Sequence, residues 1–138
     1  MIVLDTNVVS EVMTGEPTSP ALTWLTDQST ADLRISAVTV MEISYGLSRL
    51  PNGRKKNRLS TFWDGIVDVW AANILVIDLD SARLAGEMLG MRSHAGRPLH
   101  FADALIAAVS LRHGAALATR NVKDFGGLGL TLVNPWLP

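Results

Sequence analysis

The sequence predicts an α/β fold with a mostly parallel central sheet of four to five short strands and helices on both faces. Short apolar runs alternate with longer segments whose apolar residues recur at helical intervals, which is typical of a parallel sheet covered by helices. The runs are apolar throughout, as expected of strands buried on both faces. No internal repeat and no Gly/Ser linker interrupts the 138 residues, so we expect one domain over residues 1–138.

The strands are predicted from their apolar and β-branched runs, and the helices from their spacing and end signals. The expected strands are residues 2–4, 33–36, 74–77, 115–119 and 131–133, with 74–77 the clearest. The expected helices are residues 7–13, 21–25, 38–50, 54–72, 81–91 and 99–112.

Helix ends and helix faces are predicted from individual residues. Ser36 is expected to cap the helix 38–50, and Asp80 with Ser81 to cap the helix 81–91. Gly114 is expected to end the last helix. We assign two groups of apolar side chains at helical spacing to packing rather than to base stacking. They are the stripe Val38, Met41 and Tyr45 and the aromatic residues Phe62, Trp63 and Trp70.

Charge and composition exclude several classes of protein. Twelve Lys and Arg against thirteen Asp and Glu give a net charge of −1, so the overall charge does not favour nucleic-acid binding. The absence of cysteine excludes disulfides, zinc–thiolate sites and thiol nucleophiles. No apolar run approaches the roughly 20 residues of a membrane span, and no signal peptide is recognisable. We therefore expect a soluble, cytoplasmic protein.

Three acidic residues are the first candidates for chemistry. Asp5 follows the first strand, and functional clefts of open parallel sheets lie beyond the carboxyl ends of the strands. Asp103 lies early in an otherwise apolar helix, and Glu42 lies within another helix. Each has an ordinary alternative as a cap, a dipole partner or a solvated side chain. Gathered at one sheet edge, however, they would repel one another unless a cation lay between them, and oxygen ligands favour Mg²⁺ or Mn²⁺.

At this point the chain is seen to resemble the PIN-domain family, in particular the bacterial VapC and FitB type ribonuclease toxins. The resemblance extends from end to end and depends on motifs that occur in the family's order. They are the opening residues 2–7 (IVLDTN), residues 38–43 (VTVMEI), residues 101–107 (FADALIA), residues 118–125 (ATRNVKDF) and the closing residues 132–136 (LVNPW). The resemblance implies a three-layer PIN-like fold.

The resemblance further implies a metal-dependent endoribonuclease. Asp5, Glu42 and Asp103 would form the catalytic acidic cluster around one or two Mg²⁺ or Mn²⁺ ions, which activate water against the phosphodiester. The family often has a further acid where this chain has Asn121, and Asp124 is the candidate that would compensate. An ordinary cap or turn role for Asp124 stays open. The expected supporting hydrogen-bonding residues are Asn7, Thr119 and Asn121; for Thr6 a plain turn role is equally open.

Partners follow from the same resemblance. A VapB- or FitA-like antitoxin would block the site, and the toxin would form a homodimer and a larger complex with its antitoxin. The RNA substrate requires local cations, because the net charge supplies none. The candidates are Arg54, Lys55, Lys56, Arg58 and Arg97. A solvated helix start is the alternative reading of residues 54–58.

Two other functions remain open from the sequence. Asp5 with Asn7 partly imitates the nucleophile motif of haloacid dehalogenase-like phosphatases, but that family needs a second acid at the position of Asn7. The other alternative is a PIN-like module that binds RNA or a partner without cutting, and Asn121 in place of an acid keeps it open.

Overall fold

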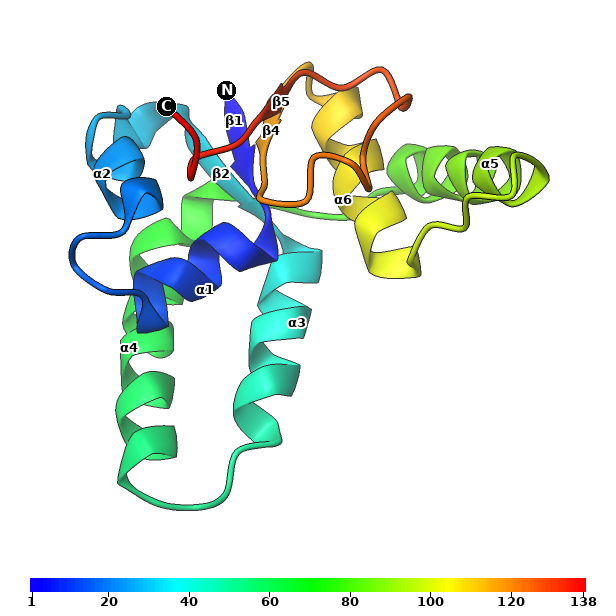
Figure 1. Cartoon of the computed structure of the whole chain (residues 1–138). Helices are drawn as coiled ribbons and strands as arrows, with labels where there is room; N and C mark the ends of the chain where they lie inside the picture. The colour runs from blue at the N-terminus through cyan, green and yellow to red at the C-terminus, as the bar shows by residue number, and fades with distance from the viewer.

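A parallel sheet of five short strands, in the order β3-β2-β1-β4-β5, forms the centre of the molecule in the computed structural model, which describes residues 1–138 (Figure 1). All four strand pairings are parallel. The strands are β1 (Ile2–Leu4), β2 (Leu33–Ser36), β3 (Ile74–Leu75), β4 (Ala116–Ala118) and β5 (Leu132–Val133). The predicted fold class is confirmed.

Six helices cover the sheet in two groups (Figure 1). The helices are α1 (Thr6–Thr14), α2 (Pro20–Thr26), α3 (Ala37–Ser48), α4 (Arg54–Trp70), α5 (Leu79–His94) and α6 (Phe101–Arg112). Two 3-10 turns, Thr30–Asp32 and Ala71–Asn73, precede β2 and β3. Gly114, with a φ of 62°, ends the region of α6 as expected, because glycine adopts this conformation without strain.

Two hydrophobic clusters form the core, one on each face of the sheet. Neighbouring strand residues point to opposite faces, so Val3 packs with α5 and α6 whereas Leu4 packs with α1, α3 and α4. The first cluster contains a run of fully buried residues of α6, Ile106 to Ala108. The second contains Trp63 of α4. Burial on both faces explains why these strands read as continuous apolar runs.

The strand register places chemically important residues at one edge of the sheet. Leu4 of β1 pairs with Ala118 of β4, so the next residues, Asp5 and Thr119, lie side by side. The backbone N–H of Asp5 donates to the carbonyl of Ala118 at 2.9 Å, and that of Thr119 donates to Val133 at 2.9 Å. The chain segments that follow β1, β4 and β5 therefore meet at the carboxyl edge.

The third strand is shorter than predicted. The apolar run 74–77 predicted four strand residues, but β3 ends at Leu75 and the Val76 side chain is 70% exposed. Leu75 pairs with Ser36, the last residue of β2, whose hydroxyl accepts a hydrogen bond from Thr39 N and so caps α3. Because β2 turns into a helix there, β3 has no ladder partner beyond Leu75.

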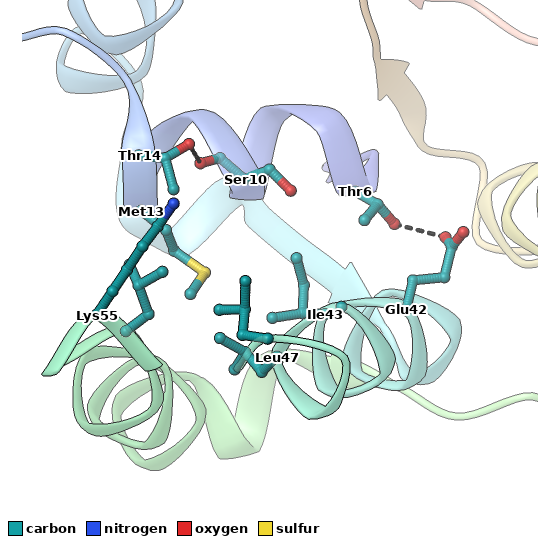
Figure 2. A pocket seen from close by; sticks show the side chains of 11 residues that line it. Thr6, Ser10, Met13, Thr14, Glu42, Ile43, Leu47 and Lys55 are labelled. Atoms are coloured by element: carbon teal, nitrogen blue, oxygen red, sulfur yellow. Dashed lines mark hydrogen bonds between the residues drawn. The ribbon is translucent and has the colours of Figure 1, made fainter. Parts of the chain in front are cut away.

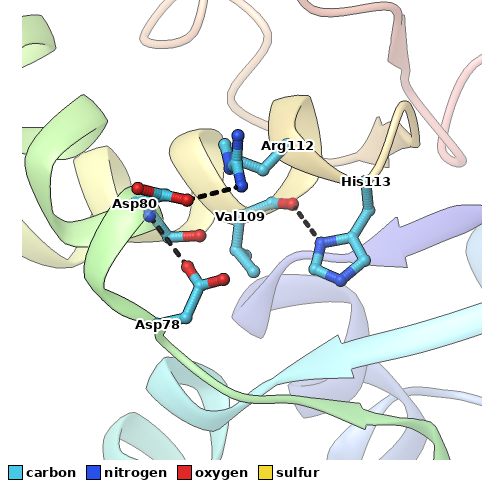
Figure 3. A network of polar contacts seen from close by, with 6 residues as sticks. Asp78, Asp80, Val109, Arg112 and His113 are labelled. Atoms are coloured by element: carbon cyan, nitrogen blue, oxygen red, sulfur yellow. Dashed lines mark hydrogen bonds and ion pairs between the residues drawn. The ribbon is translucent and has the colours of Figure 1, made fainter.

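The start of α5 also differs from the prediction. Asp78, not Asp80, is the N-cap: its Oδ1 accepts a hydrogen bond from Ser81 N at 2.8 Å (Figure 3). Asp80 instead forms an ion pair of 3.0 Å with Arg112 at the end of α6. Both aspartates suit an N-cap locally, and packing of α5 against α6 selects the first of them.

Three side chains that were expected to pack lie on the surface. Met41 and Tyr45 of α3 are 57% and 60% exposed, whereas Thr39 and Ile43 face the interior. Phe62 of α4 is likewise exposed. Among the aromatic residues of α4, only Trp63 is buried as expected, and Trp70 is partly buried. No helix of the structure is both long and apolar enough to cross a membrane.

Candidate functional site

A polar pocket of about 460 Å³ opens at the carboxyl edge of the sheet. None of its lining side chains is hydrophobic. They come from α1, α3, α6 and the segments directly after β1 and β4: Asp5, Thr6, Asn7, Ser10, Glu11, Glu42, Asp103, Arg120 and Asn121. The three acids predicted from the sequence therefore line one pocket, although they are far apart in the chain. We call it the acidic pocket.

Asp5 is held by three hydrogen-bond donors. Its side chain caps α1 by accepting from Thr6 N at 2.8 Å through Oδ1. Its Oδ2 accepts from Thr119 Oγ1 at 2.7 Å and from Asn7 Nδ2 at 3.2 Å. Asp5 is only 4% exposed, and this burial raises its pKa, while the three donors act in the opposite direction. The capping and the candidate catalytic roles of Asp5 are thus compatible.

Thr119 organises the residues after β4. Its hydroxyl is fully buried and, besides donating to Asp5, accepts hydrogen bonds from Asn7 Nδ2 at 3.3 Å and from Asn121 N at 3.0 Å. The side-chain carbonyl of Asn7 in turn accepts from Arg120 N at 3.3 Å. The predicted supporting residues Asn7, Thr119 and Asn121 are therefore joined in one network around Asp5.

Glu42 is positioned by Thr6. Thr6 Oγ1 donates to Glu42 Oε1 at 2.7 Å, as Figure 2 shows, and is also hydrogen-bonded to Thr39 Oγ1 at 3.1 Å. These contacts join the first turn of α1 to α3. The sequence left the role of Thr6 open between a turn residue and a supporting residue, and its contacts are those of a residue that orients Glu42.

Asp103 differs from the other two acids because no protein group donates a hydrogen bond to its carboxylate. It lies in the first turn of α6 and is half-buried. Burial first, and then the negative charges of Asp5 and Glu42, raise its pKa from 3.8 to about 6, with an opposing contribution from His100. The ionised form of Asp103 is therefore disfavoured in the metal-free chain, because its carboxylate lies beside other negative charges and receives no hydrogen bond from the protein.

Asp124 lies next to the acidic pocket but does not line it. It borders a smaller cavity of about 120 Å³ together with Asp103, His100 and Arg92. The Arg92 side chain is buried, and its Nη2 donates to the backbone carbonyls of Asp124 at 2.6 Å and Gly126 at 2.8 Å. Asp124 thus lies near Asp103, in a loop that α5 holds in place.

The predicted basic residues are dispersed. Arg54 to Arg58 lie in the first turns of α4, at the end of the α3–α4 pair that points away from the sheet (Figure 1). Lys56 Nζ donates to the carbonyls of Ser48 and Leu50. Lys55 lines a groove of about 260 Å³ between α1, α3 and α4, which shares Thr6, Ser10 and Glu42 with the acidic pocket (Figure 2). Arg97 lies on the loop before α6.

The structure also brings to the site residues for which the sequence predicted no role. Ser10 and Glu11 line the acidic pocket from α1, and Arg120 lines it from the segment after β4. Ser10 lies one helical turn from Thr6, so helical periodicity was an available signal for it. Arg120 stands inside a motif that was recognised, but the motif gave no direction for its side chain.

Fold and site together define an α/β domain with a carboxylate-lined pocket at the carboxyl edge of a five-stranded parallel sheet. The chain belongs to the PIN domain family, whose profile matches residues 2–125. The predicted family is confirmed, and the haloacid dehalogenase alternative is set aside.

Relatives match over the whole length of the chain. The chain is 36% identical to VapC ribonuclease Y4jK of Sinorhizobium fredii, covering 100% of this chain and 99% of the relative. It is 34% identical to toxin FitB of Neisseria gonorrhoeae, covering 99% of each. Among solved structures, FitAcB from Neisseria gonorrhoeae superposes with a TM-score of 0.91 at 33% identity, covering 100% of both chains. DNA-bound VapBC from Salmonella typhimurium has a TM-score of 0.81 at 21% identity, covering 97% of both, and supports the fold.

Proposed function

We propose that this chain is the toxin of a toxin–antitoxin pair and that it hydrolyses RNA phosphodiester bonds with the help of Mg²⁺ or Mn²⁺. The observation that carries the proposal is the acidic pocket, in which Asp5, Glu42 and Asp103 face one polar cavity without an ion-paired base. The relatives named VapC ribonuclease and toxin FitB support the class of activity.

The donor set fits a hard divalent cation. Its carboxylate oxygens are the ligands that Mg²⁺ and Mn²⁺ prefer, and Asp103 has both oxygens free. No group of three or more acidic or histidine side chains is arranged so that it would hold an ion alone. This agrees with Mg²⁺, which keeps several waters and is commonly bound by one or two carboxylates together with substrate phosphate. Asp5, Glu42 and Asp103 would therefore hold the ion only together with waters and the substrate phosphate, with Asp124 near Asp103.

The chemistry that a divalent cation supplies in such a site is Lewis acidity towards water and towards the negatively charged phosphodiester. The chain itself contributes orientation and charge. Thr119 and Asn7 fix Asp5, and Thr6 fixes Glu42, so two carboxylates keep their direction before any substrate arrives. Asp103, whose carboxylate receives no hydrogen bond, is free to turn towards the ion.

An antitoxin partner is part of the proposal. Structures that superpose on this chain include FitAcB and DNA-bound VapBC, which are complexes of such toxins with their antitoxins. We expect a VapB- or FitA-like protein to bind this chain and to cover the acidic pocket. A basic side chain from that partner would neutralise the carboxylates in place of a metal ion.

A non-catalytic RNA- or partner-binding module is the second candidate. The observation that favours it is Asn121, which lines the acidic pocket with an amide where the family often has an acid. With one carboxylate fewer, the pocket still binds cations and phosphates but holds a second metal ion less firmly.

RNA cleavage distinguishes the two candidates. The antitoxin-free chain is incubated with a mixed RNA pool in Mg²⁺, Mn²⁺ or EDTA, beside Asp5→Asn, Asp103→Asn and Asp64→Asn. Asp64 lies exposed on α4, outside the acidic pocket, and serves as the matched control. We expect cleavage that needs the metal and both pocket acids but not Asp64. A folded wild-type chain that binds RNA and never cuts it would support the non-catalytic module.

A further inference from the structure

We propose that a second polar pocket, beyond the carboxyl ends of β4 and β5, binds a backbone phosphate of the RNA strand next to the position of cleavage. This inference rests on the proposed nuclease function and names a subsite of it. The pocket has a volume of about 390 Å³ and is lined by Arg120, Asn121, Val122, Lys123, Asp124 and Asn134. We call it the phosphate pocket.

The phosphate pocket lies next to the acidic pocket. Arg120 and Asn121 line both of them. The reason is the strand order: β4 lies between β1 and β5, so the segment after β4 borders the space beyond β1 on one side and beyond β5 on the other. An RNA strand whose scissile phosphate lies at the acidic pocket can therefore extend past Arg120 along polar side chains.

Arg120 is fixed at the border between the two pockets. Its guanidinium carbon lies 4.3 Å from the ring centroid of Trp136, a cation–π contact. The Trp136 ring packs against the hydrophobic cluster on the α1 side of the sheet, and its Nε1 is buried without a hydrogen-bond partner. The ring is thus held by apolar packing and by Arg120, and not by a hydrogen bond of its Nε1. Trp136 is accordingly a positioning residue for Arg120.

The cations of the phosphate pocket are free to bind an anion. The structure contains a single ion pair, Asp80 with Arg112, so neither Arg120 nor Lys123 has a carboxylate within 4.0 Å. A guanidinium presents several donors in a plane and suits phosphate oxygens. Arg97 adds charge to the same loop, since its Nη2 donates to the carbonyl of Lys123 at 3.4 Å.

The start of α4 is less suited to this task. Lys56 is engaged with two backbone carbonyls, and Arg54 and Arg58 line neither the acidic nor the phosphate pocket. Lys55 lines the separate groove between α1, α3 and α4, which shares Thr6, Ser10 and Glu42 with the acidic pocket. We therefore place the first contacts with the RNA backbone at Arg120 and Lys123 and not at Arg54, Lys56 or Arg58.

The test is binding of a fluorescently labelled, single-stranded RNA of mixed sequence and about ten nucleotides, measured by anisotropy in EDTA over a range of salt concentrations. The variants are Arg120→Gln and Lys123→Gln, with Arg83→Gln as the matched control on an exposed face of α5. We expect each pocket variant to weaken binding about 5- to 10-fold and to reduce the slope of log K against log salt by about 0.7, the value for one phosphate contact on a single strand. The control is expected to bind as wild type does.

Trp136 is tested by a double-mutant cycle. We expect Trp136→Leu to weaken binding as much as Arg120→Gln, the double variant to be no weaker than either, and Trp136→Phe to retain most of the binding. Additive losses would show that Trp136 does not act through Arg120. Thermal unfolding of each variant identifies any loss that comes from misfolding.

The outcomes separate the subsite from the nuclease. Pocket variants that bind like wild type, a loss of affinity without a change in salt slope, or a wild-type chain that binds no RNA would each overturn the phosphate pocket. Loss of binding in these variants while wild type never cuts RNA would support the pocket and contradict the nuclease.

Discussion

Asp103 carries an energetic cost in the metal-free chain because its charge is half-buried beside two other carboxylates. Its pKa rises from 3.8 to about 6, so between these pH values the folded state binds more protons than the unfolded state. The free energy of unfolding therefore falls as the pH rises through this window and stays low above it. Below it, Asp103 is protonated in both states and the cost is absent.

We expect Asp103→Asn to stabilise the metal-free chain by roughly 1 kcal/mol at pH 7 to 8. This is less than the full pKa shift would give, because solvent screens the charge of a half-exposed group. The gain should disappear near pH 4. Urea unfolding at several pH values measures it. Mn²⁺ should raise the Tm of wild type more than that of the variant, and an equal gain at pH 4 would contradict the electrostatic explanation.

Thr119 is the residue on which the orientation of Asp5 depends most. Thr119→Val keeps the shape but removes the hydroxyl that donates to Asp5 and accepts from Asn7 and Asn121. We expect a loss of about 1 to 2 kcal/mol in stability, since buried polar groups lose their partner. RNA cleavage should fall strongly. Thr119→Ser, the control, should keep both properties; a fully active valine variant would show that Asp5 needs no such support.

At the residue scale, the sequence indicated the acids and three supporting residues, Asn7, Thr119 and Asn121. Asp5 was selected because it follows a strand and Asp103 because it lies early in a helix, and both line the acidic pocket. No role was predicted for Arg120, because the direction of its side chain depends on Trp136, which is sixteen positions away and follows another strand. Contacts of this kind come from the strand order, which a local pattern does not contain.

At the element scale, Arg92 links a helix to the loop beside the site. The hydrogen bonds of its buried side chain to the carbonyls of Asp124 and Gly126 are the only connection that α5 makes to this loop through a charged group. We expect Arg92→Met to cost about 2 kcal/mol, because two backbone acceptors lose their donor. Hydrogen exchange should accelerate in residues 120–126. Arg83→Met on the exposed face of the same helix is the control, and unchanged exchange in the loop would contradict the link.

Two errors of the sequence prediction concern the ends of secondary-structure elements. The run 74–77 is as apolar as a buried strand, yet β3 stops where β2 becomes a helix. Asp80 suits an N-cap, yet α5 starts two residues earlier and Asp80 pairs with Arg112. In both cases a neighbouring element, and not the local sequence, decides the boundary.

At the scale of the whole molecule, we expect self-association through apolar side chains that are exposed on α3. Met41 and Tyr45 lie one turn apart on α3 and are both more than half exposed, although the sequence predicted them to pack. We expect a homodimer in solution that Tyr45→Glu shifts towards the monomer, because a charge opposes burial of the patch. Light scattering after gel filtration measures this, with Val69→Glu on α4 as control. Identical dimerisation of both variants would place the interface elsewhere.

The overall architecture was predictable because short apolar runs alternate with longer helical segments and the three central strands, β1, β2 and β4, are largely buried. The strand order was not, since it depends on which segments pair at long range. That order nevertheless creates the site, by bringing Asp5 beside Thr119.

The central place of β1 has a consequence for the newly made chain. Its partner strands are β2 and β4, and β4 lies near the end of the sequence. During translation the first residues leave the ribosome long before Ala118 and Thr119 are available, so Asp5 has neither its neighbouring strand nor its main hydrogen-bond donor. The acidic pocket is completed only when synthesis is almost finished. A nascent chain of this kind carries no assembled site while it is still close to the messenger and ribosomal RNA that produce it.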